Sequence, residues 1–273
     1  MSDSIGSRKN IGKAAIIIMS ALWAAYQLYL ALISPLHPML QSPLHIIFGL
    51  IIVFLMHPAN EKRPEKKWIQ IFDVIIYAGI AFLIWYTLSQ TNRLQQRVPY
   101  ISPVTQLDMV AMIVVVIILM ESVRRVLGWS LFIFISFFIF YMWFGNIFPG
   151  IFRFKGTNLK KFTELMIMGV DGIYGTPLYT SSSVLYYFIM FGAFFSLCGG
   201  GQVLIDIGMK FSNKSSGGPA KAAVISSGLM GMISGSAVAN VSTTGVMTIP
   251  MMKKVGYLPH EAGAVESVAS TGG

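Results

Sequence analysis

Long apolar runs, separated by short polar segments, set the pattern of this chain. A soluble helix carries an apolar stripe and a polar face, whereas most of these runs are apolar all round. A helix that crosses a bilayer needs about 20 mostly apolar residues. The pattern therefore predicts six spanning helices, at 11–33, 43–56, 68–88, 107–123, 129–144 and 182–197. We expect an all-α polytopic membrane protein, in which the short second span uses flanking residues such as His45 and His57 near the interface.

Two shorter helices are predicted outside these spans. In Leu159 to Val170, the polar residues Lys160, Lys161 and Glu164 alternate with an apolar face, which is typical of a helix lying at the membrane interface. A further short helix is expected at 202–211, before a polar loop.

The segment 221–252 differs from the other apolar runs because it is full of Gly, Ser, Thr and Asn, with Pro250 near its end. Small residues let membrane helices approach closely. Gly and Pro also interrupt helices, and irregular backbone survives at membrane depth only against protein or a water-filled cavity. The segment predicts a re-entrant hairpin or a broken helix pair, with a single smooth span as the alternative.

Composition and charge support a membrane protein with a defined orientation. Hydrophobic residues make up 55% of the chain and charged ones only 11%, against about 25% charged in a typical soluble domain. With the N-terminus in the cytoplasm, most of the 20 Lys and Arg residues fall on the cytoplasmic side, as the positive-inside rule requires. This orientation needs 221–252 to enter and leave on one side, which favours the hairpin. No basic patch interleaved with aromatics indicates nucleic-acid binding.

Three acidic residues inside or beside the apolar runs have structural interpretations. Asp73 lies one turn into the third span, where a structural or interfacial role is expected. Asp108 and Glu121 bracket an apolar stretch and mark the ends of the fourth span. Glu121 has the helical spacing to pair with Arg124 or Arg125.

Glu266 is different, because it begins a new apolar segment and could face a cavity. The single cysteine, Cys198, excludes an internal disulfide, and we expect it to be a buried bystander. The four histidines are scattered, without an HExxH pattern, and no Walker-type GxxxxGK[ST] stands in the chain. We therefore expect neither an enzyme nor a cofactor. Without a nucleotide-binding motif, any active transport by this chain would need an ion gradient or a partner ATPase as its energy source.

The strongest local signal is GMISGSAVANVSTTG at 231–245. It places neutral oxygen atoms in an apolar setting, on Ser234, Ser236, Asn240, Ser242, Thr243 and Thr244. Small hard cations favour oxygen ligands, and broken helices expose carbonyl oxygens that bind Na⁺. Free N–H groups at a helix start favour an anionic substrate. The alternative interpretation is simple helix packing through small residues.

These residues also resemble a known family. GMISGSAVANVSTTG, then TIPMMKKVGY at 248–257 and AVESVASTGG at 264–273, look like the large membrane subunit of TRAP transporters. The stretch 175–223 fits the same subunit. The pattern is most similar to the fused permeases that pair with TAXI-type binding proteins. Residues 1–127 resemble the small four-helix subunit only by helix number and hydropathy, so 128–273 would be the N-terminal part of the large subunit.

The resemblance implies a Na⁺-coupled secondary transporter in the cytoplasmic or inner membrane of a bacterium or archaeon. A soluble extracytoplasmic binding protein would deliver the substrate, usually an organic acid. The large subunit of this family carries two inverted repeats with re-entrant hairpins. Its implied partners are a TAXI-type binding protein, the remaining part of the large subunit and membrane lipid.

The resemblance also implies a site, which would lie at the first hairpin tip and at the break in the next helix. Substrate-binding residues would be Ser234, Gly235, Ser236 and Asn240. Na⁺, as coupling ion, would contact Ser236, Asn240, Thr243, Thr244, Ser270, Thr271 and Gly272.

The sequence departs from the family's pattern at Gly273, where the family continues into its second repeat. We interpret the chain as the first repeat only, either a fragment or a truncated product, which would not transport alone. A non-transporting membrane scaffold is the competing hypothesis. An intramembrane enzyme is disfavoured, because no paired acids or nucleophile–base motif appears.

Overall fold

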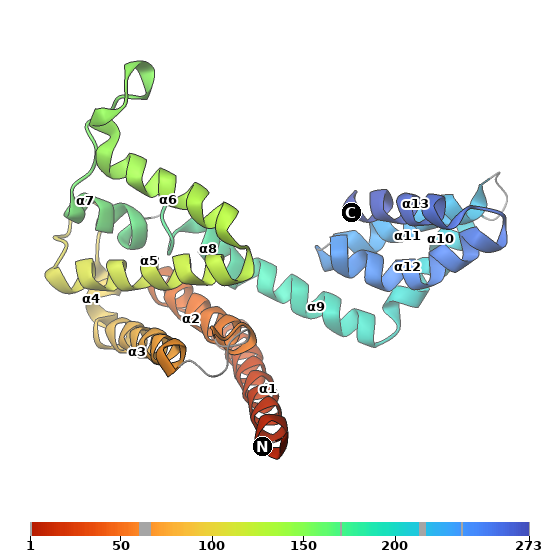
Figure 1. Ribbon diagram of the computed structural model, residues 1–273, viewed down its shortest axis with the longest axis horizontal. Coiled ribbons are helices and arrows are strands. Elements are labelled where there is room, and N and C mark those ends of the chain that lie inside the picture. Colours follow the sequence, from red (N-terminus) through yellow and green to blue (C-terminus); the bar gives the residue numbers. More distant parts are fainter. Residues whose placement is uncertain (1, 60–66, 170, 213–216, 236, 273) are drawn as a thin grey trace. The chain divides into compact units, whose positions relative to one another are not determined.

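The computed structural model describes residues 2–59, 67–169, 171–212, 217–235 and 237–272, which form helices joined by turns and loops (Figure 1). Six helical stretches are long and apolar enough to cross a membrane, which confirms the predicted fold class. They are Gly12–Leu32, Pro38–Met56, Ile71–Ser89, Gln106–Val126, Trp129–Ile147 and Thr176–Phe195. The chain divides into two compact units, Met1–Ser182 and Ser183–Gly273. These bounds differ from the predicted domains 1–127 and 128–273, which stay a prediction.

The first unit is built from eight α-helices in the described residues. These are α1 (Ser2–Leu32), α2 (Pro38–Met56), α3 (Lys67–Ser89), α4 (Thr91–Gln96), α5 (Gln106–Val126), α6 (Trp129–Phe144), α7 (Leu159–Thr163) and α8 (Thr176–Thr180). π-helical turns follow α7 at Glu164–Met168 and α8 at Ser181–Leu185. The second span is longer than predicted, because Pro38 stands in the first turn and Pro43 is accommodated inside the helix.

The core of the first unit lies between α2, α3 and α5, which pack against one another. Ile47, Leu83 and Val115 are among its buried side chains. Phe162 of α7 and Ile167 of the following π turn join the same core. The apolar face of the predicted amphipathic helix is therefore covered by protein, and its place at a membrane interface stays a prediction.

Ion pairs tie the ends of these helices together. The pairing of Glu121 with both Arg124 and Arg125 is confirmed. Arg125 also pairs with Asp73 of α3, at 2.8 Å between Nη2 and Oδ1. This bridge links α3 to α5 and gives Asp73 the structural role that was expected.

The opposite end of α5 carries a second ionic cluster that depends on α4, a helix that the hydropathy pattern did not predict. Arg93 pairs with Asp108, and the Tyr86 hydroxyl donates to Asp108 at 2.5 Å. Asp108 also forms a reciprocal capping box with Thr105 at the start of α5. The acidic residue thus marks the helix end, as predicted, and also fixes α4 against it.

Two expectations about single residues were wrong. Glu164 was placed on a polar face beside two lysines, but it is buried and pairs with Arg97. The paired guanidinium offsets the cost of burying that carboxylate. Cys198 was expected to be buried but is exposed, because it follows the end of α9 at a turn.

The second unit contains α9 (Tyr186–Leu197), α10 (Gly200–Ser212), α11 (Gly218–Ser234), α12 (Ala237–Lys254) and α13 (Pro259–Thr271). The last four pack closely, with α11 in contact with α10, α12 and α13 (Figure 1). α11 ends at Ser234 and is capped by Gly235, whose φ of +60° is the left-handed conformation that glycine adopts without strain. The broken helix pair is therefore observed and the single smooth span is wrong, whereas entry into a membrane from one side stays a prediction.

Close packing of α10 against α11 depends on Gly208. A Cβ atom there would lie 2.9 Å from the Ala222 carbonyl oxygen, which is backbone and cannot turn away. We expect Gly208→Ala to destabilise the protein by about 1–3 kcal/mol, the usual cost of overpacking. The matched control is Gly228→Ala, since a Cβ atom there meets nothing within 4 Å, and helix propensity favours alanine by about 1 kcal/mol. Thermal unfolding of both variants measures this, and equal melting temperatures would contradict it.

Candidate functional site

A buried polar cluster lies where α11, α12 and α13 meet. Its residues come from all three helices: Ser227 from α11, Asn240, Thr244 and Thr248 from α12, and Glu266 and Ser270 from α13. Their relative exposures are at most 2%. Residues four apart share one helix face. The spacing of 240, 244 and 248, and of 266 and 270, therefore turns two polar stripes inward.

Glu266 is the centre of the cluster, because hydroxyl groups from all three helices reach its carboxylate. Oε1 accepts from Ser227 Oγ at 3.0 Å and from Ser270 Oγ at 3.3 Å, and it also bonds Thr244 Oγ1. Oε2 accepts from Thr248 Oγ1 at 2.5 Å. A fully buried carboxylate is thus held by hydrogen bonds from uncharged groups.

Each of the two threonine hydroxyls lies within reach of at least two acceptors. Thr244 Oγ1 lies 2.9 Å from the Asn240 carbonyl oxygen and also contacts Glu266. Thr248 Oγ1 lies 3.0 Å from the Thr244 carbonyl oxygen and also contacts Glu266. A hydroxyl carries one proton and donates only once. Each threonine therefore serves either its own helix or the carboxylate, and the cluster is rich in oxygen lone pairs.

Asn240 closes the cluster on the side of α11. Its Nδ2 donates to the Ser227 carbonyl oxygen at 2.8 Å, which ties the two arms of the hairpin together. Its Oδ1 atom is buried and has no hydrogen-bond partner among the residues that the structure describes. A buried amide oxygen that is left unpaired costs about 1–3 kcal/mol, so this atom is a candidate ligand for a group bound there.

Gly245 lets α12 and α13 approach at the level of the cluster. A Cβ atom at this position would lie 3.1 Å from Cγ of Glu266, tighter than an ordinary contact. The glycine in the predicted motif therefore makes room for the glutamate side chain.

The structure brings together three of the sequence-predicted site residues, Asn240, Thr244 and Ser270. Thr271 is exposed and its hydroxyl bonds its own helix at Ser267 and Val268. Thr243 is half-buried, on the side of α12 that faces Gly201 of α10.

The remaining predicted residues lie at helix ends. Gly235 forms the exposed turn of the hairpin, and Gly272 is exposed at the end of α13. Ser236 and the side chain of Ser234 lie outside the described residues.

Sequence reasoning missed Ser227 and Thr248 and treated Glu266 apart from the site. The repeat of Asn, Thr and Thr at four-residue intervals was a signal for Thr248, since such residues share a helix face. Nothing in the sequence indicated Ser227, because it reaches the cluster only through the packing of α11 against α12 and α13.

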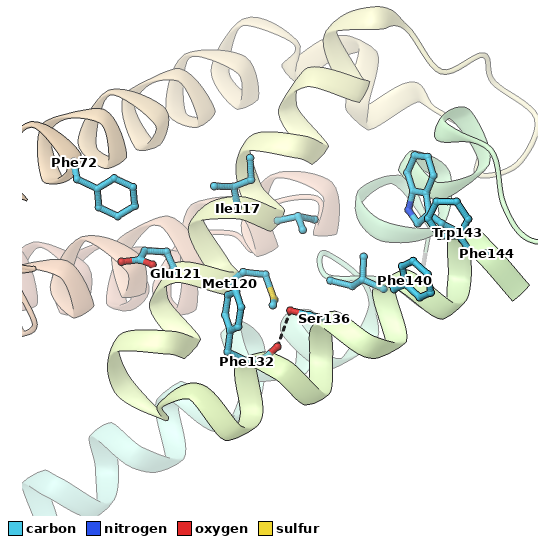
Figure 2. A pocket seen from close by; sticks show the side chains of 11 residues that line it. Phe72, Ile117, Met120, Glu121, Phe132, Ser136, Phe140, Trp143 and Phe144 are labelled. Atoms are coloured by element: carbon cyan, nitrogen blue, oxygen red, sulfur yellow. Dashed lines mark hydrogen bonds between the residues drawn. The ribbon is translucent and has the colours of Figure 1, made fainter.

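A groove in the first unit has a different character. The groove of about 560 Å³ lies between α3, α5 and α6 and is lined by side chains such as Phe72, Met120 and Phe140 (Figure 2). Ser136 points into it, but its hydroxyl bonds the Phe132 carbonyl oxygen, as the dashed line shows. Glu121 at its edge is already paired with arginines. The described side chains that line the groove therefore offer no convergent polar groups for a charged substrate.

Apolar helices long enough to span a membrane, with a buried polar cluster among shorter ones, define a multi-pass membrane protein. The chain belongs to the family described as the DctM component of the tripartite ATP-independent periplasmic transporter, whose model matches residues 114–273. The matched part contains the whole second unit. The family is one of transporter permeases and not of enzymes.

One curated relative is a Haemophilus influenzae protein named "Putative TRAP transporter large permease protein". It is 29% identical over 112 residues, which are 41% of this chain and 25% of the relative. The match therefore spans about a quarter of the length of that relative. No solved structure matches the chain.

Proposed function

We propose that this chain is the permease component of a Na⁺-coupled TRAP transporter that imports an organic acid delivered by a binding protein. One observation carries the proposal. A single carboxylate, ringed by uncharged hydroxyl groups, is buried where three helices of the family-matched part meet. An ionised carboxylate without a charged partner is costly to bury, and a bound cation would offset that cost.

The donor set suits Na⁺ as the transported coupling ion. Hard cations favour carboxylate, hydroxyl and carbonyl oxygens, and these are the groups that converge here. The unpaired Oδ1 atom of Asn240 adds one more oxygen. Of the proposed Na⁺ ligands, Asn240, Thr244 and Ser270 agree with this cluster. Ser236, Thr243, Thr271 and Gly272 stand on the resemblance alone.

The hairpin turn is the proposed place for the substrate. α12 begins at Ala237, directly after the turn at Gly235. The N–H groups of a first helical turn lack helical partners and favour an anion. A carboxylate held there by Ser234, Gly235, Ser236 and Asn240 would lie at the start of α12, the helix that also carries Thr244 and Thr248 of the oxygen cluster. Substrate and ion would then share one structural element.

The proposed assembly has further parts beyond the site described above. A binding protein of the TAXI type would present the organic acid, and residues 1–127 would act as a fused small-subunit scaffold. The remaining part of a large subunit would complete the permease. The N-terminus would lie in the cytoplasm, and the assembly in a bacterial or archaeal inner membrane.

Uptake into proteoliposomes tests this proposal. The chain is combined with the remaining part of the large subunit and the binding protein, and a labelled organic acid is supplied with Na⁺ or K⁺ outside. We expect uptake only with Na⁺ and only with the binding protein, because both are proposed to be obligatory. Uptake that proceeds unchanged in K⁺ would refute the coupling. Absence of uptake under every ionic condition would favour the non-transporting scaffold.

A further inference from the structure

Glu266 carries the only acidic side chain in the buried cluster, and the described residues give it no basic partner. The ion pairs of the described structure all lie in the first unit. The lysines described in the second unit are exposed, on Lys210, Lys221, Lys253 and Lys254. His260 is exposed as well. When ionised, this carboxylate therefore leaves one unbalanced negative charge among three helices.

The surrounding oxygens are arranged to accept a cation as well as to donate protons. Ser227 Oγ lies 3.0 Å from Thr244 Oγ1, 3.4 Å from Ser270 Oγ and 3.0 Å from Glu266 Oε1. Four oxygens from three helices thus lie side by side. If Thr244 donates its proton to the Asn240 carbonyl oxygen, its lone pairs turn toward this group. Each threonine hydroxyl has one proton and can donate to its own helix or to Glu266, but not to both. A cation at this place would give the Glu266 carboxylate a partner when the threonine protons are donated to the helix.

We infer that Glu266 is the charged ligand of a monovalent-cation site, and that Ser227 is its ligand from α11. The inference rests on the proposed Na⁺ coupling and adds two residues to it. One carboxylate with neutral hydroxyl groups balances a single positive charge, which favours Na⁺ over a divalent ion. The bound ion joins α11, α12 and α13, so it stabilises the packing of the hairpin against the next helix.

Na⁺-dependent thermal unfolding of the purified 273-residue chain in detergent tests this inference. Melting temperatures are measured in NaCl, KCl and choline chloride at equal ionic strength, and with added CaCl₂. The wild-type chain is expected to show a saturable increase with Na⁺ that neither K⁺ nor Ca²⁺ reproduces. Ligands that bind only the folded state raise its melting temperature in this way.

Two substitutions and one matched control separate the site from general effects. Glu266→Gln keeps the size of the side chain but removes the charge, and it should abolish the Na⁺ response. Ser227→Ala keeps the charge and should raise the Na⁺ concentration at half effect by tenfold or more. Glu261→Gln is the control, because Glu261 is an exposed residue of the same helix whose side chain, within the described part of the chain, bonds only the Leu258 N–H. It should respond like the wild type.

Three outcomes would overturn the inference. One is a Na⁺ response that persists in Glu266→Gln, and another is a wild-type chain without a Na⁺-specific response. The third is an infrared band of a protonated carboxylic acid that disappears in Glu266→Gln and is unchanged by Na⁺, which identifies a proton as the occupant. If Glu266→Gln also fails to fold, Ser227→Ala decides the question alone. Na⁺-dependent uptake by the complete permease, alongside any of these outcomes, would leave the proposed function standing.

Discussion

Replacing Asn240 by alanine in the complete permease is expected to raise the Na⁺ concentration for half-maximal uptake by about tenfold or more, equal to about 1.4 kcal/mol of lost binding. The substitution removes the hydrogen bond from Nδ2 to the Ser227 carbonyl oxygen. It also removes the buried Oδ1 atom that lacks a partner in the described structure. Both losses loosen the oxygen cluster without touching its charge. The measurement is the Na⁺ dependence of labelled substrate uptake into proteoliposomes.

Ser242→Ala is the matched control for this experiment. Ser242 lies on the same helix, but it is exposed, and among the described residues its hydroxyl bonds only the Val238 carbonyl oxygen. We expect uptake and its Na⁺ dependence to match the wild type. If Asn240→Ala and Ser242→Ala behave alike, the cluster is packing and not an ion site. That result would favour the alternative interpretation of the motif, in which its small residues serve only close packing of the helices.

Replacing Arg97 by alanine is expected to destabilise the protein by about 3–5 kcal/mol, the cost of leaving a buried charge without its partner. The Arg97 side chain is 1% exposed and that of Glu164 is 10% exposed. Arg97 Nη1 donates to Glu164 Oε1 at 2.8 Å, and Nη2 donates to the Ser102 carbonyl oxygen at 2.8 Å. Thermal unfolding in detergent measures the loss. Lys160→Ala, an exposed change on α7, is expected to stay within about 0.5 kcal/mol.

The same pair gives a pH dependence with a definite sign. The Arg97 guanidinium lowers the pKa of Glu164 below its ordinary value, against the opposing effect of burial. A carboxyl whose pKa is lower in the folded state adds stability above its unfolded pKa. That stability is lost as the pH falls through the lowered value. We expect the melting temperature to fall in this acidic range, and a Glu164→Gln variant to lack this part of the decline.

A combined replacement by apolar residues separates the pair from its surroundings. Arg97→Met with Glu164→Leu removes both charges while keeping much of the volume. We expect it to recover most of the stability that Arg97→Ala loses, because neither partner is left charged and alone. If the double variant is as unstable as Arg97→Ala, the stability comes mainly from the bonds of the pair to the backbone, at the Ser102 carbonyl oxygen and the Tyr100 N–H.

The helices of this protein were predictable because each apolar run carries its own signal. Apolar length alone fixes a spanning helix, since a bilayer leaves the backbone no other partners than its own. The amphipathic segment after Leu159 was also predictable, but the burial of Glu164 was not. Its partner Arg97 lies 67 positions earlier in the sequence, and no local pattern connects the two.

The candidate site was predictable in part, for the same reason. The run of small polar residues at 231–245 stands out within one stretch of sequence, and it contributes Asn240 and Thr244. Glu266 was noticed only as a lone acid in an apolar segment. Its hydroxyl partners lie 18, 22 and 39 positions away, besides Ser270 on its own helix. Their convergence arises from how α11, α12 and α13 pack.

The sequence by itself determined that this chain is a helical membrane protein with an unusual apolar segment rich in small polar residues, and its resemblance indicated the transporter family to which it belongs. Hydropathy and small-residue patterns are local, so they can be recognised in the sequence without knowing how the helices pack. Only the tertiary structure decided which polar side chains meet. It placed Glu266 at the centre of the hydroxyl cluster and paired Glu164 with Arg97. The physical reason is that helix packing brings residues into contact that are distant in the sequence, and that burying a charge costs free energy unless it is paired or hydrogen-bonded.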